Sequence, residues 1–467
     1  MKKRPIAIIG GGLAGLAAAF RLAEAGCRPI VIETRRRLGG RATSFADPRT
    51  GLILDNGQHV MLGCCTNLID FYDRLGVLDL IQWHRTLYWT KGRGLIDTTR
   101  AGLLPAPLHM TGSLHRMRIF TKEEKRGIAR GMWRLIRLGS KGRLRWKDRT
   151  FAEFLADCGQ PESVVRGFWN TVILSACNAD VERVDAAVAI MVFQEGFLAN
   201  RWSYTLGLPT VPLSRMHEPA GRLIEQGGGE IRLGTSARAI AYDGKRITGV
   251  VTDDGLIEAS AVIAAVPFDR LDALVSKPMR AADQRLTRLD QIEHSPILSV
   301  NLLFDRQIME LPHLVLVERG VHWLINRGVD EDGRQLVHAL ISAAHEWMAL
   351  SEEEIVRRVL EDLHHALPGA RGIEPVAVRA VKEKRATFAA TPRVEQYRPR
   401  AAPGYVGMGG GGIPNLYLAG DWCDTGWPAT MESAVRSGYA AATAITGHGG
   451  VIDDVPPSWL ARRLGLK

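Results

Sequence analysis

Apolar positions at the start of the chain form a strand, a glycine turn, a helix and a second strand. The runs at 5–10 and 29–33 are almost continuously apolar, which is typical of buried parallel strands. Between them, residues 13–26 are rich in Ala and Leu, with Arg21 and Glu24 as polar positions. A secretion signal or a membrane anchor would share the basic, apolar opening. A signal, however, is followed by an unrelated mature chain, and these two charges would be costly in a bilayer. We therefore predict a β-α-β unit.

Further patterns predict secondary structure in the middle of the chain. Residues 230–267 consist of short β-rich runs broken at Asp243-Gly244 and Asp254-Gly255, as a meander of hairpins requires. Residues 352–368 have the apolar spacing of an amphipathic helix. The region from about 65 to 215 is predicted to be mainly helical and irregular, and 393–415 to be a connector rich in Pro and Gly.

The end of the chain repeats the architecture of its opening. An apolar strand ends at Gly420 and Asp421, a loop follows, and a helix begins near Thr430 and Met431. A helix N-terminus offers free N–H donors and a dipole that favours negative charge. Two such ends suggest a ligand long enough to be held at both, which FAD fits better than NAD. The alternative is a C-terminal helix that only packs on the sheet.

The glycine turn has the spacing of a dinucleotide-binding site. Gly10, Gly12 and Gly15 would allow, in that order, the tight turn, the approach of a pyrophosphate and the packing of helix on strand. Glu33 ends the second strand, where it can bind a ribose 2′-hydroxyl and would repel the 2′-phosphate of NADP. A merely structural β-α-β unit is the alternative. The motif RRRLGGRATSF adds a second close backbone approach at Gly40 and a fork donor for phosphate at Arg41.

These elements predict an α/β fold with two domains. The FAD-binding domain is Rossmann-like, a parallel sheet with a β-meander, and is assembled from the discontinuous segments 1–75, 214–275 and 403–450. An α+β substrate-binding domain takes 76–213 and 276–402, with a basic, helical part at 115–149 that is a candidate for membrane docking.

Composition narrows the protein class. The chain has 467 residues, 46% of them hydrophobic, which is enough for two cores. After the opening segment no apolar run is long enough to span a bilayer. Six cysteines without a C-x-x-C pair favour a reducing, cytoplasmic compartment and argue against a disulfide framework or a metal site.

The net charge of +10 is concentrated in one segment. Residues 115–149 contain thirteen Lys or Arg and three acids, a surplus of ten. Apolar and basic positions then follow opposite stripes at helical spacing: Ile128, Met132, Leu135 and Ile136 on one, and Arg126, Arg130, Arg134, Arg137 and Lys141 on the other. Such a helix is typical of anionic membrane surfaces, here the inner face of the cell membrane. A packed helix with a solvated Arg face is the alternative. Nucleic acid is disfavoured because no recognition motif accompanies the charge.

Several motifs carry a family resemblance. GGGLAGLAAA, RRRLGGRATSF, the meander ending AAVP and LYLAGD with a Met-Glu helix start resemble the flavin amine oxidase and phytoene desaturase superfamily. DNGQHVMLGC, SPILSVNLLFDRQIMELPH, KEKRATFAATP and AGDWCDTGWPATMESAVRSG resemble, more narrowly, the bacterial hydroxysqualene dehydroxylases, also called squalene-associated FAD-dependent desaturases. The resemblance runs along nearly the whole chain.

The resemblance implies a set of FAD contacts. The ADP half is held by Gly10, Gly12, Gly15, Glu33, Gly40 and Arg41, with the adenine on the backbone of Ala237. The ribityl chain and ring edge are held by Gly420, Asp421 and the amide of Met431, and Gly57, Gln58 and His59 border the reactive face. One departure concerns Thr430, where amine oxidases place an aromatic residue of the cage that orients the amine. Because Trp427 alone cannot form that cage, amine oxidation becomes a distant alternative.

The implied reaction is reductive removal of the hydroxyl of hydroxysqualene, giving squalene for hopanoid-type synthesis. It needs an acid, and His59 is the first candidate because imidazole titrates near neutral pH; a flavin-contacting role is its alternative. Asp55 is the second candidate, or it caps the DNGQH turn. Helical aromatics could line a substrate tunnel or simply form core: Phe168, Trp169, Phe193, Phe197 and Trp202. A carotenoid-type desaturase and a non-catalytic lipid-carrying flavoprotein stay open as functions, and other squalene-pathway enzymes are candidate partners.

Overall fold

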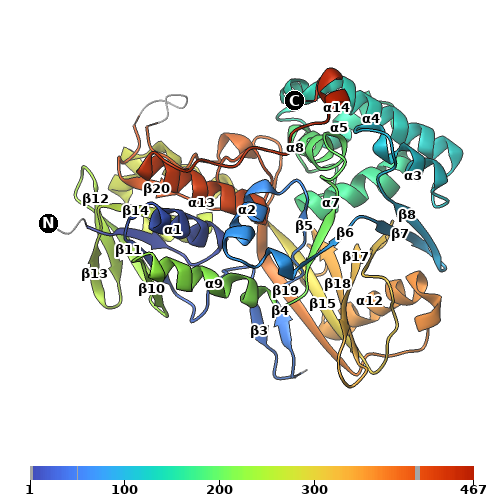
Figure 1. Cartoon of the computed structure of the whole chain (residues 1–467), viewed down its shortest axis with the longest axis horizontal. Helices are drawn as coiled ribbons and strands as arrows, with labels where there is room; N and C mark the ends of the chain where they lie inside the picture. Colours follow the sequence, from blue (N-terminus) through green and yellow to red (C-terminus); the bar gives the residue numbers. More distant parts are fainter. Residues whose placement is uncertain (1–3, 50, 405–410, 467) are drawn as a thin grey trace.

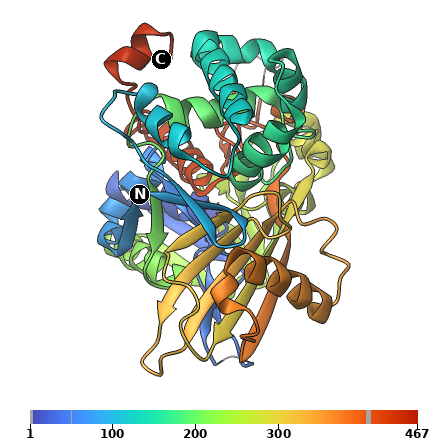
Figure 2. The same cartoon turned by 90° about the vertical axis from the view of Figure 1, so that its right-hand side faces the viewer.

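A computed structural model describes residues 4–49, 51–404 and 411–466. Of the predicted connector at 393–415, residues 405–410 lie outside the described residues. Figure 1 shows a parallel sheet with its helices and a β-meander on one side, a larger, mainly antiparallel sheet on the other, and a helical part above the latter. Figure 2 shows the helical part from the side, stacked over the larger sheet.

The predicted β-α-β unit forms the centre of a five-stranded parallel sheet. Its strands lie in the order β10-β2-β1-β14-β20, with β1 (Ile6–Ile9) between β2 (Pro29–Glu33) and β14 (Ala261–Ala264). The edge strands are β10 (Glu230–Leu233) and β20 (Leu416–Leu418). β1, β2 and β14 are buried along their whole length, as their apolar letters require. Residues 6 and 416 therefore belong to one sheet, which confirms that both chain ends build it.

Three helices cover this sheet. α1 (Leu13–Glu24) packs against both α13 (Met431–Thr446) and α9 (Leu213–Gln226). The approach of α1 and α13 is close because Gly438 has no side chain: a Cβ there would lie 2.3 Å from the carbonyl oxygen of Ala14. The meander predicted for 230–267 is present only in its middle, as antiparallel β11 (Ala237–Tyr242), β12 (Ile247–Thr252) and β13 (Gly255–Glu258). The prediction is wrong at both ends, because β10 and β14 pair in parallel with β2 and β1.

The second large sheet has seven strands in the order β19-β15-β18-β17-β16-β7-β8. Their bounds are β19 Ala377–Phe388, β15 His294–Phe304, β18 Gln335–Ser342, β17 Trp323–Val329, β16 His313–Leu316, β7 Leu87–Gly92 and β8 Leu95–Thr99. The predicted helix α12 (Glu352–Ala366) covers one face, where Leu298, Val300 and Leu302 meet Ile355, Val359 and Leu363. The opposite face of this sheet turns toward the rest of the molecule.

The prediction of helix and irregular structure for 65–215 is wrong at its edges. β7 and β8 are a hairpin that extends the seven-stranded sheet. β6 (Ile81–His84) and β9 (Leu206–Pro209) form a smaller sheet with β5 (Met61–Leu62). Their partners lie far away in sequence, so tertiary pairing rather than a local pattern makes them strands. A short hairpin, β3 (Ser44–Ala46) with β4 (Ile53–Asp55), leads into the DNGQH motif.

The remaining helices belong to more than one part of the molecule. They are α2 Thr66–Arg74, α3 Thr111–Arg116, α4 Lys122–Gly142, α5 Phe151–Asp157, α6 Glu162–Val164, α7 Thr171–Cys177, α8 Ala186–Phe193, α10 Phe268–Leu274, α11 Lys277–Ala282 and α14 Trp459–Arg463. Of these, α2 packs on α13 and α10 packs on β11, whereas α4 to α8 belong to the helical part. In the part of the chain that the structure describes, none of the helices has the length and apolar character needed to cross a membrane.

The predicted basic helix is α4. It begins with a capping box between Thr121 and Glu124 and buries Ile128, Leu135 and Ile136. Gly131 lies against the ring of Trp169, where a Cβ would be 2.4 Å from the indole. The basic stripe faces solvent: Arg126, Arg130, Arg134, Arg137 and Lys141 are all exposed.

The helical aromatics are core side chains rather than tunnel walls. Trp169 and Phe193 are fully buried, with ring centroids 4.8 Å apart, and Phe168 and Phe197 pack on them. Trp202, by contrast, is on the surface. Of the two interpretations that the sequence left open, the structure therefore favours core packing for Phe168, Trp169, Phe193 and Phe197.

Candidate active site

A cleft of about 830 Å³ opens where the carboxyl ends of β1 and β2 face the meander, β19 and the start of α13. This volume is within the range of small-molecule and cofactor sites. The cleft brings together twelve of the predicted site residues: Gly10, Gly12, Glu33, Gly40, Arg41, Gly57, Gln58, His59, Ala237, Gly420, Asp421 and Met431. Gly15 and Asp55 are outside its lining.

The glycine turn has the geometry of an anion site. Gly10 has φ +107°, and a Cβ there would lie 2.6 Å from the carbonyl oxygen of Ala265. Gly15 is behind the cleft, where a Cβ would lie 2.0 Å from the Gly10 carbonyl oxygen, which matches its predicted role in packing helix on strand. Gly12 is the N-cap of α1, and Leu13 and Ala14 line the cleft, so the first-turn N–H groups are available to a phosphate.

Glu33 closes the same turn. Its Oε2 accepts a hydrogen bond of 2.7 Å from the N–H of Gly11, and its Oε1 accepts one of 2.8 Å from the N–H of Arg35. Each carboxylate oxygen has a second lone pair, so Glu33 can also accept ribose hydroxyls. The backbone bonds orient the carboxylate toward the cleft that it lines.

Arg41 and Asp421 join the two ends of the chain across the cleft. Arg41 Nη2 lies 2.5 Å from Asp421 Oδ1, and Nη1 donates to the carbonyl of Ala386. Burial lowers the pKa of Arg41, but the charge and hydrogen bond of Asp421, together with the charges of Glu383 and Asp269, raise the pKa overall. The sequence predicts separate roles for these residues, at the phosphates and at the ribityl chain; the structure makes them one unit.

The loop after β20 delivers the N-terminus of α13. Gly420 donates its N–H to Ser437 Oγ, and a Cβ at Gly420 would lie 2.3 Å from the indole nitrogen of Trp422. Thr430 caps α13 by accepting from the N–H of Ser433, so that Met431 begins the helix at the cleft. Trp427 is buried with its ring under Arg436 and does not line the cleft.

Arg398 is a residue that sequence reasoning missed. Its guanidinium, 1% exposed, donates to four backbone carbonyls of this loop, those of Asp421, Trp422, Cys423 and Trp427, and pairs with Glu395 at 2.7 Å. A buried cation is costly unless its donors are satisfied, so the loop and Arg398 stabilise each other. The sequence places Arg398 in a Pro- and Gly-rich connector, which offers no periodic signal for such a role.

The DNGQH motif forms another edge of the cleft. Gln58 Oε1 lies 3.1 Å from His338 Nδ1, and His59 Nδ1 lies 3.2 Å from the carbonyl oxygen of Gly57. A carbonyl only accepts, so we assign the proton of neutral His59 to Nδ1. Burial lowers the pKa of His59, which keeps the ring neutral at pH 7.

Asp55 has a structural role. Its Oδ1 accepts from Ser44 Oγ at 2.7 Å and from the N–H of Leu213 at 3.0 Å, and its Oδ2 lies 3.4 Å from Arg327 Nη2. It therefore satisfies the first residue of α9, a helix start far away in sequence. Its carboxylate is engaged and lies outside the cleft lining, which favours this capping of α9 over the predicted role as an acid. The side-chain contacts go to Ser44, Leu213 and Arg327 rather than to the DNGQH turn that the sequence suggested.

The wall from the seven-stranded sheet contains polar groups that the sequence did not single out. Glu383 and Ser299 line the cleft, and Glu383 Oε2 accepts from Asn56 Nδ2 at 3.2 Å. Asn301 and His338 are paired across β15 and β18, so they share a face. Within the described ranges, Ser299 Oγ, Asn301 Oδ1 and His338 Nε2 are buried without a hydrogen-bond partner. These residues come to the same face of the sheet only through the register in which β15 pairs with β18, two strands that are far apart in sequence.

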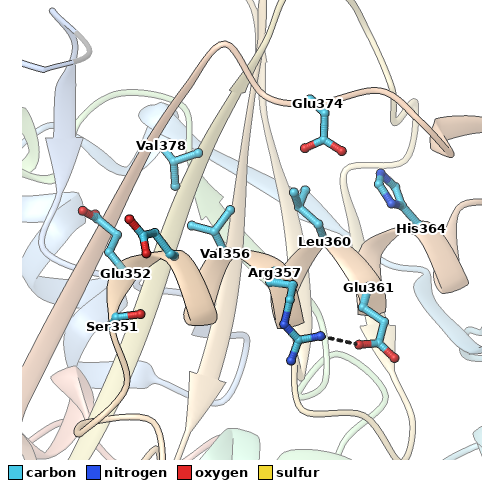
Figure 3. Close-up of a pocket in the computed structure, with 10 residues that line it drawn as sticks. Ser351, Glu352, Val356, Arg357, Leu360, Glu361, His364, Glu374 and Val378 are labelled. Carbon is cyan, nitrogen blue, oxygen red and sulfur yellow. Dashed lines mark ion pairs between the residues drawn. The ribbon is translucent and has the colours of Figure 1, made fainter.

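A second groove lies on the far side of the same sheet. Its volume is about 950 Å³, and α12 and the loop before β19 form it (Figure 3). Glu352, Glu361 and Glu374 line it, with Arg357 pairing Glu361 at 3.5 Å. The predicted site residues are absent from the lining of this groove, so the predicted chemistry belongs to the cleft.

Comparisons with known proteins agree with this geometry. The chain is 28% identical over 450 residues to the hydroxysqualene dehydroxylase of Sinorhizobium fredii, covering 93% of this chain and 96% of that protein. It is 26% identical over 469 residues to the 15-cis-phytoene desaturase of Synechococcus elongatus, covering 94% and 95%. Among solved structures, a putrescine oxidase variant shares the fold with a TM-score of 0.73 at 19% identity, covering 96% of this chain and 99% of the other.

Family assignment rests on most of the chain. The model of the family described as "Flavin containing amine oxidoreductase" matches residues 13–446. The polar groups in the cleft suit a flavin dinucleotide. The free N–H groups at the start of α1 can donate to the pyrophosphate, and the carboxylate of Glu33 can accept from the ribose hydroxyls. FAD is thus the cofactor, and the chain is a flavin-dependent oxidoreductase that belongs to the flavin-containing amine oxidoreductase family.

Proposed function

We propose that this protein reductively removes the hydroxyl group of hydroxysqualene to give squalene. The observation that carries the proposal is the buried, unpartnered hydroxyl of Ser299 in the cleft lining. Asn301 Oδ1 and His338 Nε2 are further unpartnered buried atoms of the same sheet, outside that lining. Buried polar groups are costly without a partner. A substrate with a hydroxyl group, or the water released from it, supplies that partner, whereas an all-hydrocarbon polyprene does not.

The relatives alone leave two reactions open, since a phytoene desaturase and a hydroxysqualene dehydroxylase match at 26% and 28% identity. A desaturase of hydrocarbon polyprenes is the second candidate. The polar sheet wall favours the dehydroxylase. Amine oxidation is less well supported, because Trp427 is buried under Arg436 and Thr430 supplies no aromatic wall.

The proposed chemistry requires one proton and one hydride per turnover. The allylic alcohol loses its oxygen as water after protonation, and the resulting carbon centre accepts hydride, so that R–OH, H⁺ and hydride give R–H and H₂O. When bound, reduced FAD supplies the hydride. The apolar remainder of the cleft and the buried sheet keep water from the cationic carbon.

We assign to Glu383 the role of the acid that protonates the leaving hydroxyl group. It lines the cleft, is half-buried, and is held by Asn56 Nδ2 and by the N–H of Arg385, each at 3.2 Å. His59 keeps the alternative role from the sequence, a neutral contact at the reactive face, because burial lowers its pKa. Glu383→Gln should lower kcat by roughly 100-fold or more, a general-acid effect. His59→Asn should cost roughly tenfold or less. Equal losses would contradict the assignment.

The deciding experiment is anaerobic incubation of the purified yellow protein with reduced flavin and hydroxysqualene, followed by mass spectrometry of the lipids. We expect squalene to accumulate in proportion to protein. Ser299→Ala with retained flavin should slow the reaction. No squalene, together with new double bonds in a hydrocarbon polyprene when an oxidant is present, would support the desaturase instead.

We also propose that the protein associates peripherally with the inner face of the cell membrane, where such a substrate is dissolved. The exposed stripe of α4 supports this proposal. Arg134 lies 3.4 Å from Asp157, so part of the stripe is neutralised. Binding to anionic vesicles should weaken as salt rises and in the variant Arg130→Gln, Arg134→Gln, Arg137→Gln. Unchanged binding by that variant would show that α4 is only a solvated helix.

A further inference from the structure

Exposed apolar side chains gather where three distant loops meet. Leu103 is 99% exposed, Leu104 51%, Trp202 45% and Trp459 62%. They lie in the segments 101–107, 199–203 and 456–460, which we call the three-loop tip. Arg201 Nη2 donates to the carbonyl of Gly102, Asn200 Nδ2 to that of Pro456, and Ser458 Oγ to that of Ala106. These bonds make the three segments one surface, beside α14 in Figure 2.

The tip is held rigidly by the structure beneath it. Tyr204 Oη accepts from the N–H of Ala101 and donates to the carbonyl of Arg85, both at 2.7 Å. Ala106 and Pro107 are buried under the loop, whereas the two leucines point outward. Leu103 is the most exposed large apolar side chain in the described part of the chain. Two adjacent leucines presented on an anchored loop, with two exposed tryptophans in the neighbouring segments, form an apolar patch of the kind that marks an interaction site.

The surroundings of the tip are strongly basic. Residues 98–122, 196–217 and 455–467 contain no Asp or Glu. Arg100, Arg116, Arg462 and Arg463 are exposed around it. The guanidinium carbons of Arg85 and Arg201 lie 4.6 and 5.0 Å from the ring of Trp202. Tryptophan and arginine side chains flanking leucines are the combination that anchors proteins at the boundary between headgroups and acyl chains.

The tip is continuous with the basic helix. The carbonyl of Gly465, just after α14, accepts from the N–H of Ser140 near the end of α4. Leu144, beyond that end, is a further exposed leucine at 67%. One partner can therefore contact both surfaces at once, through electrostatic attraction to α4 and through apolar contact with the tip.

We infer that the three-loop tip inserts into the interface of an anionic lipid bilayer. The excess of cations without acids selects an anionic lipid surface, and the projecting leucines reach below its headgroups. The inference deepens the proposed function by naming the surface from which substrate is drawn. Its measurement involves no turnover, so its failure and failure of the dehydroxylase proposal are distinguishable.

The test uses the full-length flavin-loaded protein and two vesicle compositions, neutral phosphatidylcholine with and without phosphatidylglycerol. Leu103→Ser with Leu104→Ser should weaken partitioning into anionic vesicles roughly tenfold or more, and the loss should persist at high salt because apolar burial is not screened. Ile53→Ser is the matched control: Ile53 is 60% exposed on the β3–β4 hairpin, and its variant should bind like the parent. Flavin absorbance and thermal unfolding verify that each variant is folded.

Hydrogen exchange of the unaltered protein supplies an independent readout. Anionic vesicles should slow exchange in peptides from 100–108 and 456–462 and leave the meander at 237–258 unchanged. Equal partitioning of the leucine variant and its parent would overturn the inference, as would protection confined to α4. Concentration-dependent dimers in light scattering, abolished by the leucine variant, would assign the tip to a second copy of the chain and also overturn it.

Discussion

The two walls of the cleft differ in how their polar groups are satisfied. On the wall built by the chain ends, Glu33 accepts from backbone N–H groups and Arg41 pairs with Asp421. On the wall built by the seven-stranded sheet, the hydroxyl of Ser299 is buried without a partner among the described residues. Asn301 and His338, on the same sheet but outside the cleft lining, each keep such an atom as well. A cofactor site can be held ready by its own bonds, whereas unsatisfied groups await a ligand. The first wall is thus organised for permanent occupancy and the second for exchange.

The strongest disruption of the first wall should come from Arg398→Leu. The change leaves four loop carbonyls without their donor and Glu395 without its partner, so unfolding should become easier by about 3 kcal/mol or more. Denaturant titration and flavin content measure the effect. Arg400→Leu, at a half-exposed arginine 3.5 Å from Asp424, should change stability by about 0.5 kcal/mol at most. Similar losses for both would refute the special role of Arg398.

Acid should destabilise both walls through their buried histidines. Burial, followed by the charge of His59, lowers the pKa of His217 to about 3, and burial holds that of His338 well below its usual range. The unfolded chain binds protons near pH 6.5 while these folded rings stay neutral, so stability is present above pH 6.5 and is lost as pH falls toward the folded values. Each such ring should cost about 2 kcal/mol between pH 6.5 and 5. Urea midpoints across this range, with His217→Gln losing less than the parent, test the sign.

Asp421→Asn should separate cofactor binding from folding. The amide keeps the shape but leaves Arg41 without a counter-charge, so FAD should bind about 1–2 kcal/mol more weakly. Flavin retained after gel filtration and its dissociation constant are the measurements. Asp424→Asn, on the same loop, is the control and should keep its flavin. Full retention by the Asp421 variant would mean that the ion pair is only structural.

A pair of serine variants on β15 should change stability least, and it should show whether the sheet wall of the cleft binds substrate. Ser299 and Ser295 lie on one strand, but Ser295 Oγ donates to the carbonyl of Asn178 at 2.7 Å while Ser299 Oγ lacks a described partner. Ser295→Ala should cost about 1 kcal/mol of stability. Ser299→Ala should be within about 0.5 kcal/mol of the parent yet lower kcat/KM for hydroxysqualene roughly tenfold, the value of one hydrogen bond. Unchanged turnover would remove the sheet wall from substrate binding.

Local patterns predicted the first wall well. The β-α-β opening, the meander and α13 each follow from apolar spacing and from turn or cap residues within a few positions of one another. The twelve predicted residues at the cleft belong to such motifs. The Arg41–Asp421 contact was not predicted, because sequence spacing says nothing of side chains that meet across the fold.

The second wall could not be predicted, because register decides it. Ser299, Asn301 and His338 share a face only through the pairing of β15 with β18. Asp55 was a candidate acid or a cap of the DNGQH turn, because its partner Leu213 is far along the chain. The β7–β8 hairpin, by contrast, is a local pairing across a turn that contains Gly92 and Gly94, and the prediction overlooked it. The exposed tip likewise joins three segments that have no pattern in common.

The bond between Arg41 and Asp421 also has a bearing on biosynthesis. A ribosome releases the glycine turn long before β20 and α13, so a nascent chain has half of its flavin cradle for most of translation. Capture of the vitamin-derived cofactor must therefore be a late, post-translational event. Until then, the alanine-rich side of α1 that receives Gly438 stays uncovered.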